Sequence, residues 1–407
     1  MEDRQRQPAG TVKYVILGVT GSVAAFKAPL LVRAIRDCGI GVKVVMTEAA
    51  RQFVTPLSLE LVSDNPVLWD SFQQPLSHIG LARDASALVV APATLNTISK
   101  FSAGIADNLL TTLFMALRAP CIIAPAMNWR MYDNAIFKER LRYLKDKGVI
   151  EVTPECGTLA CGEEGVGRMA GLQRIINALR RSIGANDMKG IRVVVSSGPT
   201  REYIDPVRFI TNKSSGKMGY ALARTASIRG ASVTLISGPT HLPAPGDMSD
   251  FEIIRVETSL EMEVAVLEKS KEADIVVMAA AVADFKPEVV SQDKLSRCDG
   301  LTLTLTKTAD ILSKLSAQRH TSNKPYITGF AAEIGDKKDR ARQKLQKKGI
   351  DMIVFNDVTA DGAGFDFDTN IMTIITGQEE LTIPKMSKED GANIIFDNIL
   401  QHIKGSI

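Results

Sequence analysis

Aromatic residues, cysteines and net charge are all scarce in this 407-residue chain. Five cysteines, an odd number in a long chain, argue against a disulfide framework and indicate a reducing, cytoplasmic location. The net charge of +3, from 49 basic and 46 acidic residues, is too small for a nucleic-acid-binding surface. No uninterrupted apolar run reaches the roughly 18–20 residues of a membrane helix, so we expect no membrane partner.

The remaining composition is that of a globular protein with more than one domain. Hydrophobic residues make up 45% and charged residues 23% of the chain, whose length exceeds that of one ordinary core. Residues 1–10 are polar and lack the apolar segment of a secretory signal, so we interpret them as a disordered tail. Cys156 and Cys161 have neither C-x-x-C spacing nor a second pair, which argues against a zinc site.

Apolar strand patterns alternate with helical patterns in both halves of the sequence. The predicted strands are 13–19, 42–46, 87–91 and 121–124 in the first half, then 192–197, 232–237, 274–280, 326–330 and 351–355, with a hairpin over 370–383. We therefore predict an α/β chain of two Rossmann-like or flavodoxin-like domains, each an open, mostly parallel sheet flanked by helices. The predicted domains are 11–184 and 191–407, joined by a polar linker over 185–190.

Three polar segments of the first half lie where predicted strands end. G-V-T-G-S-V-A-A-F-K at 18–27 offers backbone N–H groups and hydroxyls to a phosphate at a helix N-terminus, or is an ordinary glycine turn. Thr94, Asn96 and Thr97 in A-P-A-T-L-N-T either contact a ligand's ring edge or polyol chain, or cap a helix. P-A-M-N-W-R-M-Y at 125–132 is a loop before a helix whose Met and Trp suit a core.

Two further residues carry reactive groups. His78 is one of four histidines, and alone it is equally a surface or core residue. Cys161 lies in P-E-C-G-T-L-A-C-G-E-E-G-V-G-R-M at 154–169, whose four glycines predict a mobile flap rather than packed structure. By itself, a lone cysteine is more simply a small buried hydrophobe.

Taken in order across roughly residues 14–170, these segments and His78 resemble the flavin-dependent cysteine decarboxylases, and among them the phosphopantothenoylcysteine decarboxylases. The resemblance implies His78 as the catalytic base, Asn128 as the residue that engages the substrate's cysteine carboxylate, and Cys161 on a flap over the substrate. It also implies FMN as cofactor, held by Gly21, Ser22, Val23, Thr47, Thr94, Leu95, Asn96, Thr97 and Ala126.

The implied chemistry accounts for these residue types. Loss of CO₂ from a simple carboxylate would leave a carbanion, and oxidation of the adjacent C–S unit to a thioaldehyde, by hydride transfer to FMN, provides an electron sink. A histidine suits removal of the thiol proton. A thiol, with an ordinary pKa near 8.5, suits protonation of the resulting enethiolate. Cys156, five residues before Cys161, is either a second functional thiol or a spectator.

The second half contains a long loop, 196–219, between a predicted strand and a predicted helix. It is not a P-loop, because Thr211 stands where G-x-x-x-x-G-K-[ST] requires its first glycine. Ser214 to Lys217 still form an anion-binding helix N-terminus, or else a flexible loop with a charged tip. Lys344 and Lys348 share one helical face, which suits either a triphosphate or a basic surface helix.

The segments S-S-G-P-T-R-E-Y-I-D-P-V-R-F-I-T-N-K-S-S-G-K-M-G, A-A-V-A-D-F and F-A-A-E are similar to the phosphopantothenate–cysteine ligases over roughly 190–400. Both halves together resemble the fused bacterial enzymes of coenzyme A biosynthesis. The resemblance implies CTP and Mg²⁺, an acyl-cytidylate of 4′-phosphopantothenate, and displacement of CMP by the amine of cysteine. It implies a CTP site made of Met278, Ala279, Ala280, Asp284, Lys294, Ala309, Asp310, Ile311, Leu312, Phe330, Lys344 and Lys348.

Asn212 would hold the phosphopantothenate or its activated form, and Lys294 would offset charge on the departing pyrophosphate. The family often has Asn-Pro where Thr308 and Ala309 precede Asp310, so backbone contacts there depart from the pattern. The sequence does not identify the Mg²⁺ ligands. The preference for CTP over ATP, and a homo-oligomer of decarboxylase trimers and ligase dimers, possibly a dodecamer, follow from the resemblance alone.

Two other functions fit part of the pattern. An NAD(P)-dependent oxidoreductase with two Rossmann-like halves would need G-x-G-x-x-G and a matching acidic residue, which are absent. A regulatory flavoprotein that binds FMN without turnover would have no need for His78, Asn128 and Cys161 together.

Overall fold

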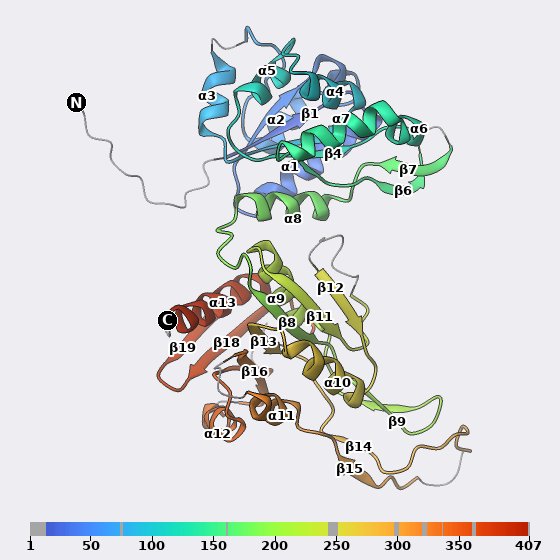
Figure 1. Ribbon diagram of the computed structural model, residues 1–407, viewed down its shortest axis with the longest axis vertical. Coiled ribbons are helices and arrows are strands. Elements are labelled where there is room, and N and C mark those ends of the chain that lie inside the picture. Colours follow the sequence, from blue (N-terminus) through green and yellow to red (C-terminus); the bar gives the residue numbers. More distant parts are fainter. Residues whose placement is uncertain are drawn as a thin grey trace, which may run out of the picture. The chain divides into compact units, whose positions relative to one another are not determined.

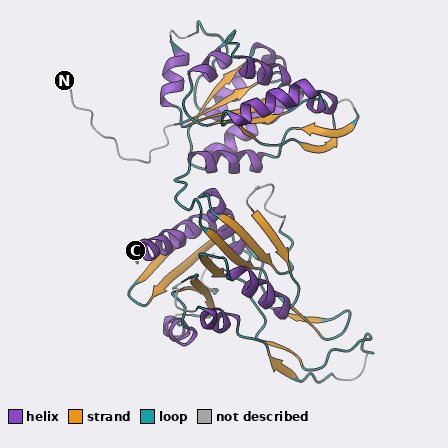
Figure 2. Cartoon of the chain, viewed as in Figure 1, coloured by secondary structure: helices purple, strands orange, loops and turns teal. Residues whose placement is uncertain are grey.

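The chain divides into two compact units, Met1–Ala185 and Asn186–Ile407. The computed structural model describes residues 14–73, 76–159, 162–242, 251–296, 301–319, 324–335, 337–359 and 364–405. Each unit has strands covered by helices (Figures 1 and 2). Cys161 and the predicted tail over 1–10 lie outside the described residues. No helix within the described ranges is long and apolar enough to span a membrane.

The first unit is built on a parallel sheet of five strands in the order β2-β1-β3-β4-β5. The strands are β1 (Val15–Val19), β2 (Val42–Met46), β3 (Ala87–Ala93), β4 (Cys121–Pro125) and β5 (Ile150–Glu151). The four longer strands are almost wholly buried and rich in valine and isoleucine, as strands covered on both faces must be. The strand order reverses between β1 and β3, the position at which open α/β sheets bind ligands.

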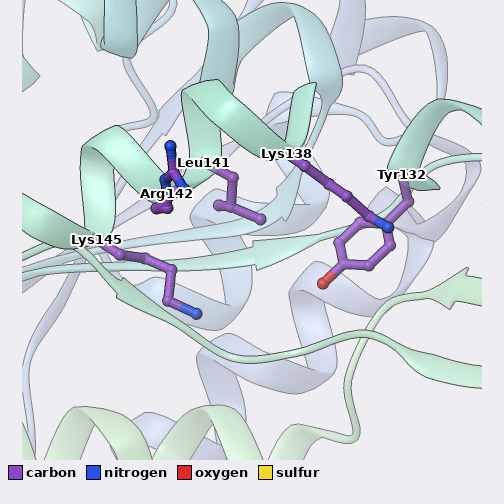
Figure 3. A pocket seen from close by; sticks show the side chains of 5 residues that line it. All are labelled: Tyr132, Lys138, Leu141, Arg142 and Lys145. Atoms are coloured by element: carbon purple, nitrogen blue, oxygen red, sulfur yellow. The ribbon is translucent and has the colours of Figure 1, made fainter. Parts of the chain in front are cut away.

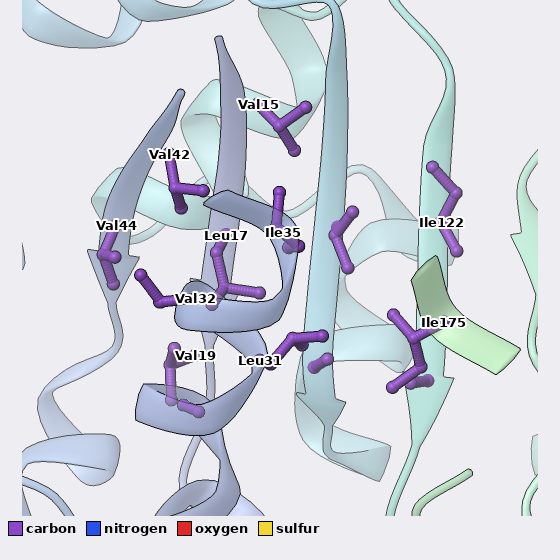
Figure 4. Packing of buried hydrophobic residues seen from close by; sticks show 14 of the residues in the cluster. Val15, Leu17, Val19, Leu31, Val32, Ile35, Val42, Val44, Ile122 and Ile175 are labelled. Atoms are coloured by element: carbon purple, nitrogen blue, oxygen red, sulfur yellow. The ribbon is translucent and has the colours of Figure 1, made fainter. Parts of the chain in front are cut away.

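Helices cover both faces of this sheet. Core side chains of α1 (Ala28–Arg36), α2 (Pro56–Ser63) and α8 (Leu172–Ile183) pack on one face. Those of α3 (Ser77–Asp84), α4 (Leu95–Ala103), α5 (Leu109–Ala116) and α7 (Ala135–Asp146) pack on the other. Figure 4 shows Leu31 and Ile35 of α1 against Leu17 of β1. Full burial of such a side chain stabilises the folded unit by about 1.5–3 kcal/mol. The sheet packed in this way is a firm support for the loops at its edge.

Shorter elements complete the first unit at the carboxyl edge of the strands. Two 3₁₀ helices, η1 (Val23–Lys27) and η2 (Glu48–Gln52), follow β1 and β2. The helix α6 (Trp129–Asp133) follows β4, and an antiparallel pair, β6 (Glu155–Thr158) and β7 (Glu164–Arg168), lies against it. A short helix therefore follows each of the strands β1, β2 and β4 at the carboxyl edge of the sheet.

The second unit has an eight-stranded sheet in the order β12-β11-β8-β13-β16-β17-β18-β19. The strands are β8 (Arg192–Ser197), β11 (Ser232–Ser237), β12 (Phe251–Arg255), β13 (Ile275–Met278), β16 (Tyr326–Glu333), β17 (Met352–Asp357), β18 (Thr369–Thr376) and β19 (Glu380–Ser387). The pairs from β12 to β17 are parallel, and β18 and β19 add an antiparallel edge. The order reverses between β8 and β13, which marks the expected ligand side.

Helices also cover both faces here. Core residues of α9 (Lys217–Ile228) and α13 (Lys388–Gly405) pack on one face, and those of α10 (Ser259–Ser270), α11 (Ile311–Gln318) and α12 (Lys338–Lys348) on the other. The prediction of two α/β domains with mostly parallel sheets is confirmed. The segment 196–219 was expected to be one long loop, but it contains the antiparallel pair β9 (Arg201–Tyr203) and β10 (Phe209–Thr211). A second pair joins β14 (Phe285–Pro287) to β15 (Leu305–Lys307).

Candidate active sites

Two hydroxyl groups join the loops that follow β1, β3 and β4. The Thr20 hydroxyl, wholly buried, donates to the Pro92 carbonyl oxygen at 2.7 Å and accepts from the Thr94 N–H at 3.0 Å. The Ser22 hydroxyl donates to the Ala126 carbonyl oxygen at 3.3 Å. Three segments that are far apart in the sequence therefore meet at the strand-order reversal, and with them the predicted FMN residues Ser22, Thr94 and Ala126.

Helix capping and ligand binding are both compatible with this arrangement. The Thr94 hydroxyl caps α4 by accepting from the Thr97 N–H at 3.4 Å, and the Ser22 hydroxyl caps η1 by accepting from Ala24 N–H at 3.4 Å. The Thr94 hydroxyl thus caps a helix, the alternative that the sequence left open for its segment, and the Ser22 hydroxyl caps one as well. Asn96 and Val23 are exposed beside them, Leu95 is half-buried, and Thr97 is 4% exposed.

Thr47 offers a buried polar group that has no hydrogen-bond partner among the described residues. Its backbone N–H donates to the Val19 carbonyl oxygen at 3.0 Å, which places it next to the end of β1. Its hydroxyl oxygen is buried and makes no hydrogen bond within the described residues. An unsatisfied buried hydroxyl costs about 1–3 kcal/mol. A bound ligand with a phosphate or hydroxyl group would remove that cost, so the predicted FMN position of Thr47 fits such a ligand.

Gly21 permits the contact between the loops after β1 and β2. A Cβ atom at this position would lie 2.5 Å from the Cβ of Ala49, closer than real side chains approach. The absence of a side chain therefore lets the 20–23 turn lie against the loop that contains Thr47. A backbone turn of this kind presents N–H groups, the usual donors to a phosphate.

His78 is the second residue of α3 and is half-buried. Within the part of the chain described, no hydrogen bond joins its imidazole to the loops around Thr20. The neighbouring Ser77 hydroxyl is buried and lacks a hydrogen-bond partner among the described residues. The role of His78 as catalytic base beside FMN therefore stays a prediction.

Asn128 is the N-cap of α6, and its side-chain oxygen accepts from the Arg130 N–H at 2.9 Å. Its amide nitrogen donates to the carboxylate of Glu163 at 3.1 Å. Glu163 is not predicted from the sequence, because nothing in A-C-G-E-E-G distinguishes it from Glu164. Only the packing of β6 and β7 on α6 brings the two segments together.

The segment 154–169 was expected to be a mobile flap rather than packed structure, but its described residues form the β6–β7 pair and β7 packs on α6. The Met127 N–H donates to the Gly167 carbonyl oxygen at 3.0 Å, and a Cβ atom on Gly167 would lie 2.1 Å from the Met127 oxygen. A Cβ atom on Gly165 would lie 2.6 Å from the Cβ of Trp129. These glycines allow close packing of a hairpin rather than freedom of a loop.

Tyr132 is the last residue of the 125–132 motif, and its side chain contacts Glu151 rather than the loops that follow β1 and β3. Its hydroxyl donates to Glu151 at 2.7 Å, and burial followed by this contact raises the pKa of the phenol. Lys145 pairs with the other oxygen of Glu151 at 3.0 Å. A surface pocket of about 150 Å³ lies here, lined by Tyr132, Lys138, Leu141, Arg142 and Lys145 (Figure 3). None of the predicted site residues lines it.

In the second unit, Asn212 joins the β10–α9 loop to the segment after β13. Its amide nitrogen donates to the carbonyl oxygens of Ala281 at 3.2 Å and Val282 at 3.0 Å. Beside it, the Ala280 N–H donates to the Ser196 hydroxyl at 3.1 Å. The predicted residues Asn212 and Met278 to Ala280 therefore lie together, where β8 and β13 end at the strand-order reversal.

Three predicted CTP residues from separate elements also come together. The Lys344 ammonium group donates to the carbonyl oxygen of Phe330 at 3.0 Å. Burial lowers the pKa of Lys344, and the charges of Asp284 and Glu333 oppose that shift. A lysine held in this way, with one nearby carboxylate from the segment after β13, is suited to contact a phosphate.

A second group consists of Asp310 and Lys348. The Asp310 carboxylate caps α11 by accepting from the Ser313 N–H at 3.1 Å and forms an ion pair with Lys348. Ile311 is 5% exposed and packs in the core, while Ala309 and Leu312 are half-buried. The Asp310 side chain caps α11 and the Ile311 side chain packs in the core. A nucleotide would therefore contact the backbone of this segment, or Lys348 on α12 beside it.

Lys294 lies on a separate segment and is exposed. Its neighbour Leu295 donates its N–H to the carboxylate of Asp205 at 3.2 Å, and Arg208 donates to the Leu295 carbonyl oxygen. Within the described ranges, no hydrogen bond or ion pair joins Lys294 to the group around Lys344. The structure thus anchors the chain beside Lys294 without bringing its ammonium group to the other predicted CTP residues.

The turn at Ser214 to Lys217, predicted to bind an anion, is partnered by the protein itself. The Lys217 ammonium group donates to the Asp366 carbonyl oxygen at 2.6 Å and to the Asp368 carboxylate at 2.8 Å. The Ser215 hydroxyl donates to the Phe365 carbonyl oxygen. Among the described residues, no group of three His, Cys, Asp or Glu side chains could hold a metal ion, and the Mg²⁺ ligands remain unidentified.

The comparisons with known proteins cover both units. Residues 188–403 match the family model "DNA/pantothenate metabolism flavoprotein C-terminal domain", and residues 3–184 match "Flavoprotein". The chain is 40% identical over 392 residues to the coenzyme A biosynthesis bifunctional protein CoaBC of Vibrio cholerae, which covers 94% of this chain and 97% of that protein. It is 44% identical over 398 residues to the CoaBC protein of Bacillus subtilis, with 96% of each covered. A crystal structure of the C-terminal domain of a CoaBC protein is 36% identical, covers 54% of this chain and 100% of that one, and has a TM-score of 0.46.

Proposed function

The chain belongs to the family of coenzyme A biosynthesis bifunctional proteins, which makes it a phosphopantothenate–cysteine ligase and a flavoprotein phosphopantothenoylcysteine decarboxylase, and we propose which residues perform each reaction. We assign decarboxylation to the first unit, with a domain over 11–184, and amide formation to the second, with a domain over 191–407. Residues 185–190 are proposed as the linker. The product of the second unit would then be the substrate of the first.

In the first unit we place FMN at the strand-order reversal. The support is the meeting of the Ser22, Thr94 and Ala126 loops, together with the buried Thr47 hydroxyl that lacks a partner among the described residues. Bound FMN would accept a hydride from the substrate and later return it. Thr47 carries the flavin assignment because its buried hydroxyl, which lacks a partner among the described residues, lies beside the end of β1 and in the loop that packs on the 20–23 turn.

The residues of this unit would handle protons and the carboxylate. His78 would take the thiol proton, so that the C–S unit can be oxidised to a thioaldehyde. Asn128 would donate a hydrogen bond to the cysteine-derived carboxylate and orient it for loss of CO₂. Cys161 would protonate the resulting enethiolate. Cys161→Ser is expected to release CO₂ without completing turnover, and full turnover by this variant would remove that role.

In the second unit, CTP would bind where the Asp284, Phe330 and Lys344 group and the Asp310 and Lys348 pair lie. Lys344, Lys348 and Lys294 would offset the charge of the triphosphate as pyrophosphate leaves. Asn212, beside the end of β13, would hold 4′-phosphopantothenate during its activation. Activation is required because a carboxylate is a poor electrophile. The amine of cysteine would then displace CMP to form the amide.

We further propose that Mg²⁺ accompanies CTP, that the enzyme acts in the cytoplasm, and that it forms homo-oligomers of decarboxylase trimers and ligase dimers, up to a dodecamer. Depletion of Mg²⁺ should stop amide formation and leave decarboxylation unchanged. Light scattering of the purified protein would give a particle mass that is a multiple of the 44.1 kDa chain. A monomer would contradict the assembly without affecting the chemistry.

One experiment tests the two assignments together. The flavin released from the purified protein is identified, and CO₂ is measured after addition of 4′-phosphopantothenoylcysteine. Amide formation from phosphopantothenate and cysteine is then measured with CTP and with ATP in turn. We expect FMN, CO₂ release, and product with CTP. Bound FMN without any turnover would favour a regulatory flavoprotein instead.

A further inference from the structure

Three side-chain donors from consecutive residues converge on the carboxylate of Glu163. Asn128 Nδ2 and Trp129 Nε1 donate to one carboxylate oxygen, at 3.1 Å and 2.9 Å. Arg130 Nη2 donates to the other oxygen at 3.0 Å. Such convergence of an amide, an indole and a guanidinium group on one anion fixes all four side chains relative to one another.

The orientation of the Asn128 amide follows from its two contacts. The side-chain oxygen caps α6 by accepting from the Arg130 N–H at 2.9 Å, and the nitrogen faces Glu163. An amide that rotated by half a turn would place its oxygen against the Glu163 carboxylate and its NH₂ against a backbone N–H. Both contacts would be repulsive, so Glu163 and the helix N-terminus together allow one orientation.

The backbone holds Glu163 in reach of α6. It directly precedes β7, and β7 packs on the Met127–Trp129 segment through Gly165 and Gly167, where a Cβ atom would collide with Trp129 or Met127. The Arg130–Glu163 pair itself is open to solvent, with side-chain exposures of 69% and 39%. Exposed ion pairs contribute about 0.2–1 kcal/mol to stability. The arrangement therefore matters more for the geometry of Asn128 than for the folding of the unit.

We propose that Glu163 is a positioning residue for decarboxylation. It holds the Asn128 amide in the one orientation that turns its nitrogen, rather than its oxygen, toward the β6–β7 hairpin. Glu163 thereby fixes which amide group would engage the substrate's cysteine carboxylate. Arg130 offsets the charge of Glu163, which limits repulsion between the two carboxylates. This inference rests on the proposed role of Asn128 and of the first unit.

The test compares Glu163→Gln with Glu164→Gln, an exposed neighbour on β7 that serves as a matched control. A glutamine at position 163 keeps the shape of the side chain but replaces one acceptor oxygen with an NH₂ group. That group would face either the Asn128 and Trp129 donors or the Arg130 donor. We expect the KM for 4′-phosphopantothenoylcysteine to rise about tenfold, which equals the loss of one hydrogen bond of about 1.4 kcal/mol. The FMN content, the Tm and the ligase activity should stay at wild-type values. Glu163→Asp, which keeps the charge, should restore part of the lost affinity.

Two results would overturn the proposal. One is a Glu163→Gln enzyme whose KM and kcat both lie within about twofold of the Glu164→Gln control. The other is a loss of FMN together with a lowered Tm in Glu163→Gln, since that would make Glu163 a structural residue. Failure of the proposed function is seen separately, because the wild-type protein itself would then release no CO₂.

Discussion

The ammonium group of Lys344 lies 3.0 Å from the carbonyl oxygen of Phe330, and burial lowers its pKa while the charge of Asp284 opposes that shift. The lysine comes from α12, the phenylalanine from β16 and the aspartate from the loop after β13. Three separate elements of the second unit therefore contribute to one charged group.

Lys344→Met should impair the ligase reaction alone. Loss of a charge-assisted contact to a phosphate costs about 1.5–3 kcal/mol, so kcat/KM for CTP should fall about 10- to 100-fold. Lys347→Met, which changes an exposed lysine of the same helix, is the matched control. Amide formation and CO₂ release are measured separately for both variants. A parallel fall of the two activities in Lys344→Met would show that the substitution disturbs more than a nucleotide site.

Thr47→Val should have opposite effects on folding and on FMN binding. Valine keeps the volume of threonine and removes the buried hydroxyl that lacks a partner in the described part of the chain. The apoprotein should therefore be as stable as wild type or more stable by up to about 1 kcal/mol, while the Kd for FMN rises about 10- to 100-fold. Thermal unfolding of the apoprotein and FMN titration by fluorescence measure the two effects. Unchanged FMN affinity would remove Thr47 from the flavin site.

Gly167→Ala should displace the β6–β7 hairpin from α6, because its Cβ atom would lie 2.1 Å from the carbonyl oxygen of Met127. A displacement of about 1 Å near the reacting groups costs about 10²-fold in rate, so decarboxylation should fall by that order. Ligase activity should be unaffected. Gly157→Ala is the control, since the nearest atom to its Cβ is the flexible side chain of Arg168 at 3.7 Å. Equal activities of the two variants would contradict the packing role of Gly167.

Lys388 should make the stability of the second unit depend on pH in the alkaline range. Its buried ammonium group donates to the carbonyl oxygens of Gly364, Phe365 and Phe367. Burial, followed by the charge of Lys217, lowers its pKa from 10.5 to about 8. At a pH between these two pKa values, Lys388 is mostly protonated in the unfolded chain and mostly neutral in the folded chain. The free energy of unfolding should therefore gain up to about 1.4 kcal/mol per pH unit from this group, starting near pH 8.

The comparison of wild type with Lys388→Met isolates that contribution. Urea unfolding followed by circular dichroism should show the wild type gaining stability over the variant as the pH rises from about 8 to about 10. Lys271→Met, at an exposed position, should differ from wild type by the same amount at each pH. A difference between wild type and Lys388→Met that does not change with pH would contradict the lowered pKa.

The sequence predicted the fold well because the buried strands carry an unambiguous pattern. The runs at 42–46 and 232–237 became β2 and β11 with the predicted bounds, since a short, mostly apolar run next to a glycine and rich in β-branched residues is typical of a buried strand. Short strands were missed where no such pattern exists. Arg201–Tyr203 and Phe209–Thr211 form an antiparallel pair through backbone contacts that charged and turn residues do not signal.

The candidate sites were predicted less completely, for a physical reason. Motif positions such as Ser22, Thr94 and Asn212 meet other loops at the strand ends, as parallel sheets require. The partners of other motif residues are far away in the sequence: Glu163 lies 35 residues from Asn128, and Asp368 lies 151 residues from Lys217. Only tertiary packing brings these pairs close. The glycines of 154–169 predict flexibility when the sequence alone is considered, whereas Gly165 and Gly167 allow close packing in the structure.

The account holds that two separate sites on one chain act in sequence, and two variants test this most directly. Lys294→Gln and His78→Asn are each given phosphopantothenate, cysteine and CTP, and separately 4′-phosphopantothenoylcysteine. We expect Lys294→Gln to decarboxylate the supplied intermediate at the wild-type rate but to form none, and His78→Asn to accumulate the intermediate. A mixture of the two variants should produce 4′-phosphopantetheine. Loss of both activities in either variant would contradict the account.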